Sequence, residues 1–93
     1  MNEIEFDFHE FIGMLERNNA IKYLPQLERD ILTYVEAVEL TIAEGASNIE
    51  EYYYEVDRCS PIQRTANHYG LTENECASIL KQACKRLDEL LES

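Results

Sequence analysis

Apolar residues recur along the chain at spacings of three and four, which is the period of a helix with one apolar face. The pattern covers residues 3–17, and it returns from Pro25 to Gly45, where the proline suits the first turn and the glycine suits the end. In the first of these helices the residues predicted to share a face are Ile4, Phe8, Phe11, Ile12 and Leu15. The sequence "RNNA" then interrupts the pattern, so we expect the first helix to end there.

Three further helix starts are marked by capping residues. Ser47 and Thr72 each have a glutamate three positions later, which is the spacing of a capping box. Between them, Ser60 suits an N-cap and Pro61 suits the first position of a short helix that ends before Gly70. The sequence therefore predicts an all-α fold of about five helices, the last of which runs from Thr72 to about residue 91.

Composition agrees with one helical domain over residues 1–93. Apolar residues make up 45% of the chain and charged residues 29%, so the chain can form a core, while three glycines and two prolines leave few turns. No apolar run of 18 residues is present, and the acidic start is unlike a signal peptide. We therefore expect a cytoplasmic protein that does not enter a membrane.

Charge divides the chain into two parts. The net charge is -11, and residues 1–57 account for all of it, with 14 acids and 3 bases. Residues 58–93 hold 5 acids and 5 bases and are neutral. Within the single domain we expect an acidic helical part at 1–57 and a helix-turn-helix-like part at 58–93.

The neutral part contains "TANHYGLTENECASIL", residues 65–80, which has the spacing of a helix-turn-helix. Gly70 is placed where the turn needs a positive φ, and Ala66 is placed four residues earlier, where the two helices touch. Thr65 departs from the pattern, because a larger aliphatic residue is usual there. The apolar residues that would face the core are Tyr69, Leu71, Cys76 and Ile79.

Over residues 60–92 the chain resembles the last two helices of sigma-factor region 4 and of LuxR-type regulators. The shared order is a Thr-Glu start, an inward apolar residue and a basic run that leads into leucines, in "GLTENECASILKQACKRLDELLE". In those families the second helix enters the major groove of DNA. The resemblance implies base contacts from Thr72, Glu73, Asn74, Ala77, Ser78 and Lys81, and phosphate contacts from Arg64, Lys85 and Arg86.

The leading hypothesis is a small bacterial or phage transcription regulator that binds double-stranded DNA. Because the chain has so few basic residues, a monomer should bind DNA weakly. We therefore expect a homodimer or a complex with RNA polymerase. The alternative is an acidic inhibitor that mimics nucleic acid and binds a basic protein, with the helix-turn-helix only as its scaffold. The carboxylates of that alternative are Glu28, Glu36, Glu39, Glu44, Glu50, Glu51 and Glu55. A third hypothesis is an oligomerisation module paired through Leu80, Ala83, Leu87 and Leu90.

Other chemistry is not expected. The only candidate zinc ligands, Cys59, His68, Cys76 and Cys84, are nine, eight and eight residues apart and contain no closely spaced ligand pair. Three cysteines make no disulfide framework. No phosphate-binding loop or nucleophile motif occurs, so we expect neither an enzyme nor a bound metal or cofactor.

Overall fold

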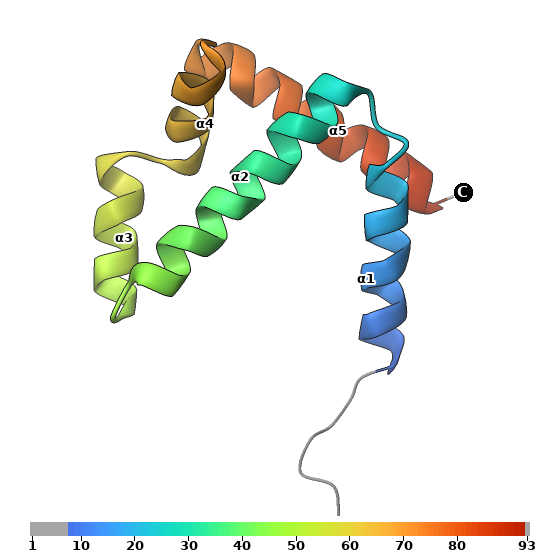
Figure 1. Ribbon diagram of the computed structural model, residues 1–93, viewed down its shortest axis with the longest axis horizontal. Coiled ribbons are helices and arrows are strands. Elements are labelled where there is room, and N and C mark those ends of the chain that lie inside the picture. Colours follow the sequence, from blue (N-terminus) through green and yellow to red (C-terminus); the bar gives the residue numbers. More distant parts are fainter. Residues whose placement is uncertain (1–7, 93) are drawn as a thin grey trace, which may run out of the picture.

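The computed structural model describes residues 8–92, and every regular element in this range is an α-helix (Figure 1). The helices are α1 (Phe8–Ile21), α2 (Gln26–Gly45), α3 (Ile49–Arg58), α4 (Pro61–Tyr69) and α5 (Glu73–Glu92). No strand occurs within these residues, which confirms the all-α prediction. Ile4 of the first predicted face lies outside the described range.

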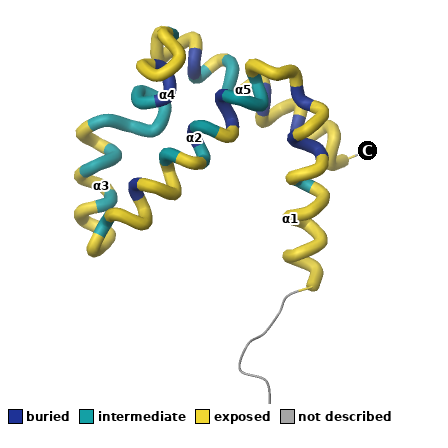
Figure 2. Tube along the Cα trace, in the orientation of Figure 1, coloured by how far each residue is buried: buried dark blue, intermediate teal, exposed yellow. Residues whose placement is uncertain are grey.

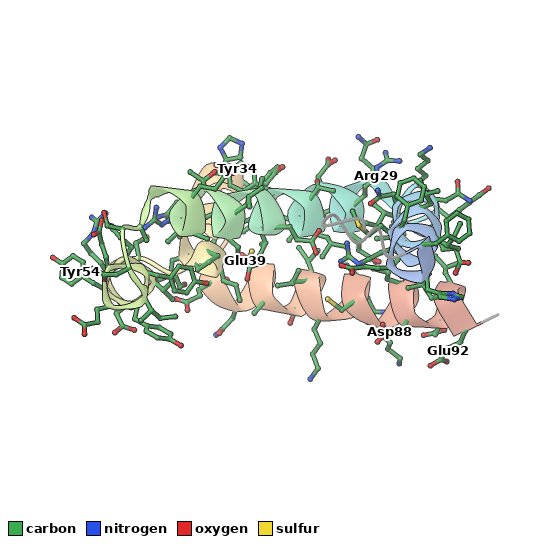
Figure 3. The ribbon with its side chains drawn as sticks, turned by 90° about the horizontal axis from the view of Figure 1, so that it is seen from below. Arg29, Tyr34, Glu39, Tyr54, Asp88 and Glu92 are labelled. Carbon is green, nitrogen blue, oxygen red and sulfur yellow. The ribbon has the colours of Figure 1, made fainter. Side chains whose placement is uncertain are left out.

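The helices form a flat arch. Figure 1 shows α1 and α3 at its two ends, joined by the long helices α2 and α5 and by the short helix α4. The smallest extent of the chain is 15 Å, which is about two layers of helices. Figure 3 shows these layers edge-on, with α2 lying over α5.

Two clusters of buried side chains hold the layers together. In the first cluster, Ile31 and Val35 of α2 pack against Ala66 of α4 and Cys76 of α5. The second cluster joins the end of α1 to α2 and α5, and it consists of Ala20, Ile21, Leu24, Leu32, Ala83 and Leu87. Leu80 is partly buried and packs against both clusters, so the core is continuous along α5.

This core corrects the hypothesis that the seam on α5 pairs protomers. Ala83 and Leu87 are buried against α1 and α2 of the same chain, and Leu80 packs on the same side. Of the four seam residues only Leu90 is exposed. The regular leucine spacing of α5 therefore results from packing in the core of the same chain and does not indicate a coiled coil.

Three predicted helix ends are wrong. α1 continues through "RNNA" to Ile21, because Ala20 and Ile21 are buried in the core and this packing outweighs the low helix propensity of two asparagines. α3 is capped by Asn48, whose side-chain oxygen accepts a hydrogen bond from the backbone N–H of Glu51 at 2.8 Å, and not by Ser47. Pro25 was predicted in the first turn of α2, but it is the N-cap and lies one residue before that turn.

The predicted signals around α4 and α5 are confirmed. Ser60 caps α4 and exchanges hydrogen bonds with Gln63 at 3.1 and 2.8 Å. Thr72 and Glu75 form the same reciprocal pair at 3.1 and 2.8 Å. Gly70 ends α4 with φ 69° and ψ 31°, in the left-handed region where a side chain is costly.

Replacing Gly70 should therefore cost stability. We expect Gly70→Ala to lower the free energy of unfolding by roughly 1–2 kcal/mol, because alanine is strained in the left-handed region. Gly45→Ala is the matched control, since Gly45 has no positive φ and an added Cβ would meet nothing within 4 Å. Urea unfolding followed by circular dichroism measures both changes, and equal losses would contradict the role given to Gly70.

Candidate nucleic-acid interface

The turn between α4 and α5 is fixed by a backbone hydrogen bond across Gly70. The N–H of Leu71 donates to the carbonyl of Ala66 at 2.9 Å, which closes the end of α4. Ala66 is buried between the helices, as its small size requires, and Cys76 is fully buried beside it. Leu71 and Ile79 are partly buried against the same cluster, so three of the four predicted inward residues, Leu71, Cys76 and Ile79, face the core.

Two positions of the motif behave differently from the pattern. Thr65 is fully buried, and its hydroxyl donates to the carbonyl of Pro61 at 2.7 Å, so its polar group has a partner inside the helix. Tyr69 is at the surface and not in the core, with its ring 5.5 Å from the ring of Tyr34. Partial desolvation, with smaller contributions from Asp30 and Tyr34, raises the pKa of Tyr69 above 10.0.

The outer face of α5 carries a row of polar side chains. Asn74, Ser78, Lys81 and Lys85 follow one another at intervals of four, three and four, on the side of the helix opposite Cys76, Ala83 and Leu87. All four are exposed. Asp88 and Glu92 continue this face, and Figure 3 shows them on the side of α5 away from α2. The positive part of the face is therefore only about one turn long.

The remaining base-contact candidates lie at or beside this face. Thr72 is exposed, but its hydroxyl accepts the N–H of Glu75 and so caps the helix. Glu73 is exposed in the first turn, and Ala77 is half-buried. The backbone N–H and then the side chain of Thr72 lower the pKa of Glu75 below 4.5. That pair therefore stabilises the helix above the ordinary pKa of the carboxyl, and the contribution is lost as the pH falls through the lowered value.

Two of the three predicted phosphate contacts already have partners. Arg64 is half-buried and donates to the carbonyls of Cys59 at 2.8 Å and of Glu55 at 3.3 Å, which ties the end of α3 to α4. The guanidinium Nε of Arg86 lies 3.0 Å from the carboxylate of Glu28, which ties α5 to α2. Lys81 and Lys85 have no ion pair with any described residue, so they are the cations of α5 that remain available.

The predicted acidic surface also divides into two sets. Three of its carboxylates are in ion pairs: Glu28 with Arg86, Glu36 with Arg17 at 2.6 Å, and Glu55 with Arg58 at 3.1 Å. The hydrogen bond to Glu36 raises the pKa of Arg17. The other four, Glu39, Glu44, Glu50 and Glu51, are exposed and form no ion pair within residues 8–92. They lie on the second half of α2 and the start of α3.

Sequence reasoning missed the structural roles of the arginines. Glu28 and Arg86 are 58 positions apart in the sequence, so no local pattern predicts their contact. The sequence also did not show which tyrosines of α3 are exposed, and the structure places Tyr53 and Tyr54 at the surface. Arg64 could have been suspected, because it follows the end of α3 by six residues and arginine side chains often satisfy terminal carbonyls.

None of the three cysteines is in a disulfide. Cys76 is buried, and that burial raises the pKa of its thiol above 9.0, while Cys59 is half-buried and Cys84 is exposed. Within the described range no three His, Cys, Asp or Glu side chains are grouped to hold a metal ion. In the same range no helix is long and apolar enough to span a membrane.

Comparison of the chain with protein-family models, with curated proteins and with solved structures found no match. Proposals about its function therefore rest on its own residues and their arrangement.

The structural role of Arg64 can be tested against an exposed cation. Arg64→Ala should lower the free energy of unfolding by about 1–2 kcal/mol, because it leaves carbonyls of α3 without their charged donor. Lys85→Ala should change it by less than about 0.5 kcal/mol, because Lys85 is exposed and holds no described residue. Urea titrations of the two variants measure this difference. Equal effects would show that Arg64 does not hold α3 against α4.

Proposed function

We propose that the protein is a small DNA-binding transcription regulator in which α4 and α5 act as a helix-turn-helix and α5 enters the major groove. The observation that carries the proposal is the two-sided character of α5. Its inner face packs on Ala66 and on α2, and its outer face presents Asn74, Ser78, Lys81 and Lys85 in one exposed row. A helix that reads bases needs one such free polar face on a rigid support.

The chemistry of this row suits base and phosphate contacts together. The side-chain amide of Asn74 can pair with adenine, donating through its nitrogen and accepting through its oxygen, and Ser78 can donate to or accept from a base edge. Lys81 and Lys85 can contact phosphates or guanine. Glu73, beside them, can accept from the amino group of cytosine.

Electrostatics limit how tightly one protomer binds. Two available lysines neutralise about two phosphates, so the logarithm of the affinity should fall by about 1.8 for each tenfold rise in salt. Two protomers on one site would double that slope. The proposed regulator therefore acts as a homodimer or with a protein partner such as RNA polymerase.

A salt series of binding to random-sequence duplex DNA tests the proposal. Fluorescence anisotropy should give weak binding that falls with salt, and the double change Lys81→Ala, Lys85→Ala should remove most of the slope. Lys22→Ala is the control, because Lys22 is exposed in the turn between α1 and α2 and away from α5's polar row. Absence of binding at low salt, or an equal loss in the control, would contradict the proposal.

A second candidate function is supported by the acidic surface on the end of α2 and on α3. Residues 39–58 hold six acids and one base, and Glu39, Glu44, Glu50 and Glu51 are exposed there. Such a surface suits a basic protein whose nucleic-acid site it would occupy. Under this alternative, Glu44→Gln with Glu50→Gln would abolish function while the lysine variant would retain it. Under the DNA-binding proposal the effects are reversed.

A further inference from the structure

α3 has an apolar face that the rest of the described chain covers only in part. At 100° per residue, four of its side chains fall within a sector of about 100°: Ile49, Tyr52, Tyr53 and Val56. Tyr52 and Val56 are half-buried, whereas Ile49 and Tyr53 are 66% and 59% exposed. No residue of α3 is buried, and Figure 2 shows the helix without a buried segment. The side of this face that holds Ile49 and Tyr53 is therefore open to solvent.

A shallow hollow continues this face onto the end of α2. It is lined by Ala43, Ala46, Asn48, Ile49 and Tyr52. The side-chain oxygen of Asn48 already accepts the hydrogen bond that caps α3, so the hollow offers mainly apolar surface. We name Ala43, Ala46, Ile49, Tyr52 and Tyr53 the α3 hollow.

Carboxylates flank the α3 hollow on both sides. Around the axis of α3, Asp57 and Glu50 lie about 40° and 60° beyond Tyr53, and Glu55 lies about 60° beyond Tyr52 on the other side. Glu50 and Asp57 are exposed and form no ion pair with any described residue. An apolar centre with an acidic rim is the complement of a surface that carries apolar and basic side chains together.

The basic residues at α3 do not neutralise this rim. Residues 39–58 hold six acids and one base. That base, Arg58, is paired with Glu55 at 3.1 Å. Arg64 of α4 donates to backbone carbonyls of Cys59 and Glu55, and its side chain is half-buried. The surface around the α3 hollow therefore keeps a negative charge.

We propose that the α3 hollow binds a basic amphipathic helix of another protein, with apolar side chains of that helix in the hollow and its lysines or arginines beside the carboxylates. A helix fits because the described residues include no strand whose edge could pair with an extended peptide. A second copy of this chain does not fit, since it would bring the same acids against these acids. The inference rests on the acidic surface of the second candidate function and names its partner, and it is independent of DNA binding by α5.

The apolar centre changes what holds such a complex together. A surface that only mimics nucleic acid attracts its partner through exposed charges, which salt screens. Burial of Ile49 and Tyr53 removes apolar area from water, and that contribution is not screened. The partner would also stabilise α3, because a helix of ten residues is marginal in water without packing.

Fluorescence anisotropy of a synthetic leucine–lysine peptide with the full chain tests the inference. In the first peptide the leucines recur at spacings of three and four, and a matched peptide has the same composition with its leucines spread around the helix. The chain should bind the first peptide about 10-fold more tightly. The preference should persist at about 1 M salt, where the Debye length is only about 3 Å.

Variants of the chain locate the contact. Ile49→Ser with Tyr53→Ser should weaken binding of the first peptide about 10-fold or more, because it removes the exposed apolar side chains. The matched control is Tyr23→Ser with Leu27→Ser, whose side chains are 73% and 50% exposed at the turn between α1 and α2, and it should bind as the wild type does. Glu50→Gln with Asp57→Asn should weaken binding mainly at low salt.

Ala43→Arg provides a variant that leaves the sequence of α3 intact. It places a large cation in the hollow from an exposed position of α2, and it should weaken binding as well. Equal binding of the two peptides, or an equal loss in the control, would overturn the inference and leave a second candidate function that depends on charge alone. Absence of binding to either peptide at low salt would contradict both.

Discussion

The fold depends on the contact of Ile31 on α2 with Ala66 on α4 and Cys76 on α5. These residues come from three helices, and each is almost completely buried. A small residue at position 66 lets α4 approach the other two closely, and the left-handed Gly70 then turns the chain directly into α5. Because α5 is fixed at this end, its inner face continues along α2 to Leu87, and its outer face is turned to solvent along its whole length.

Charges complete this frame and at the same time reduce what is left for binding. Arg86 and Arg64, which could otherwise reach phosphates, hold α5 to α2 and α4 to α3. The carboxylate of Glu28 is only 12% exposed, so removing its arginine would leave a largely buried negative group without its partner. The fold thus uses two of the few basic residues of an acidic chain, and fewer remain for the DNA contacts that we propose.

Most features set within four residues could be predicted from the sequence, although the cap of α3 was placed one residue too early, and features set by distant contacts could not. The caps at Ser60 and Thr72 and the turn at Gly70 follow from local hydrogen bonds and backbone sterics, and the structure has them where the sequence placed them. The continuation of α1 to Ile21 depends on burial against α2 and α5, which no local pattern reveals. Phe8, Phe11, Ile12 and Leu15 share one face of α1 as predicted, but periodicity tells only that residues share a face and not what that face contacts.

The small number of available lysines bears on how the proposed regulator, in so acidic a chain, would select a DNA site. Non-specific affinity comes almost entirely from phosphates, and the two lysines of one protomer supply little of it. In the proposed complex, discrimination would then come from Asn74, Ser78 and their neighbours at base edges, with little competition from random sequence. A second protomer would double these base contacts, and it would also double the small number of phosphates contacted. A low net affinity for DNA backbone is therefore compatible with the proposed function, because it favours the ratio of specific to non-specific binding on which a regulator depends.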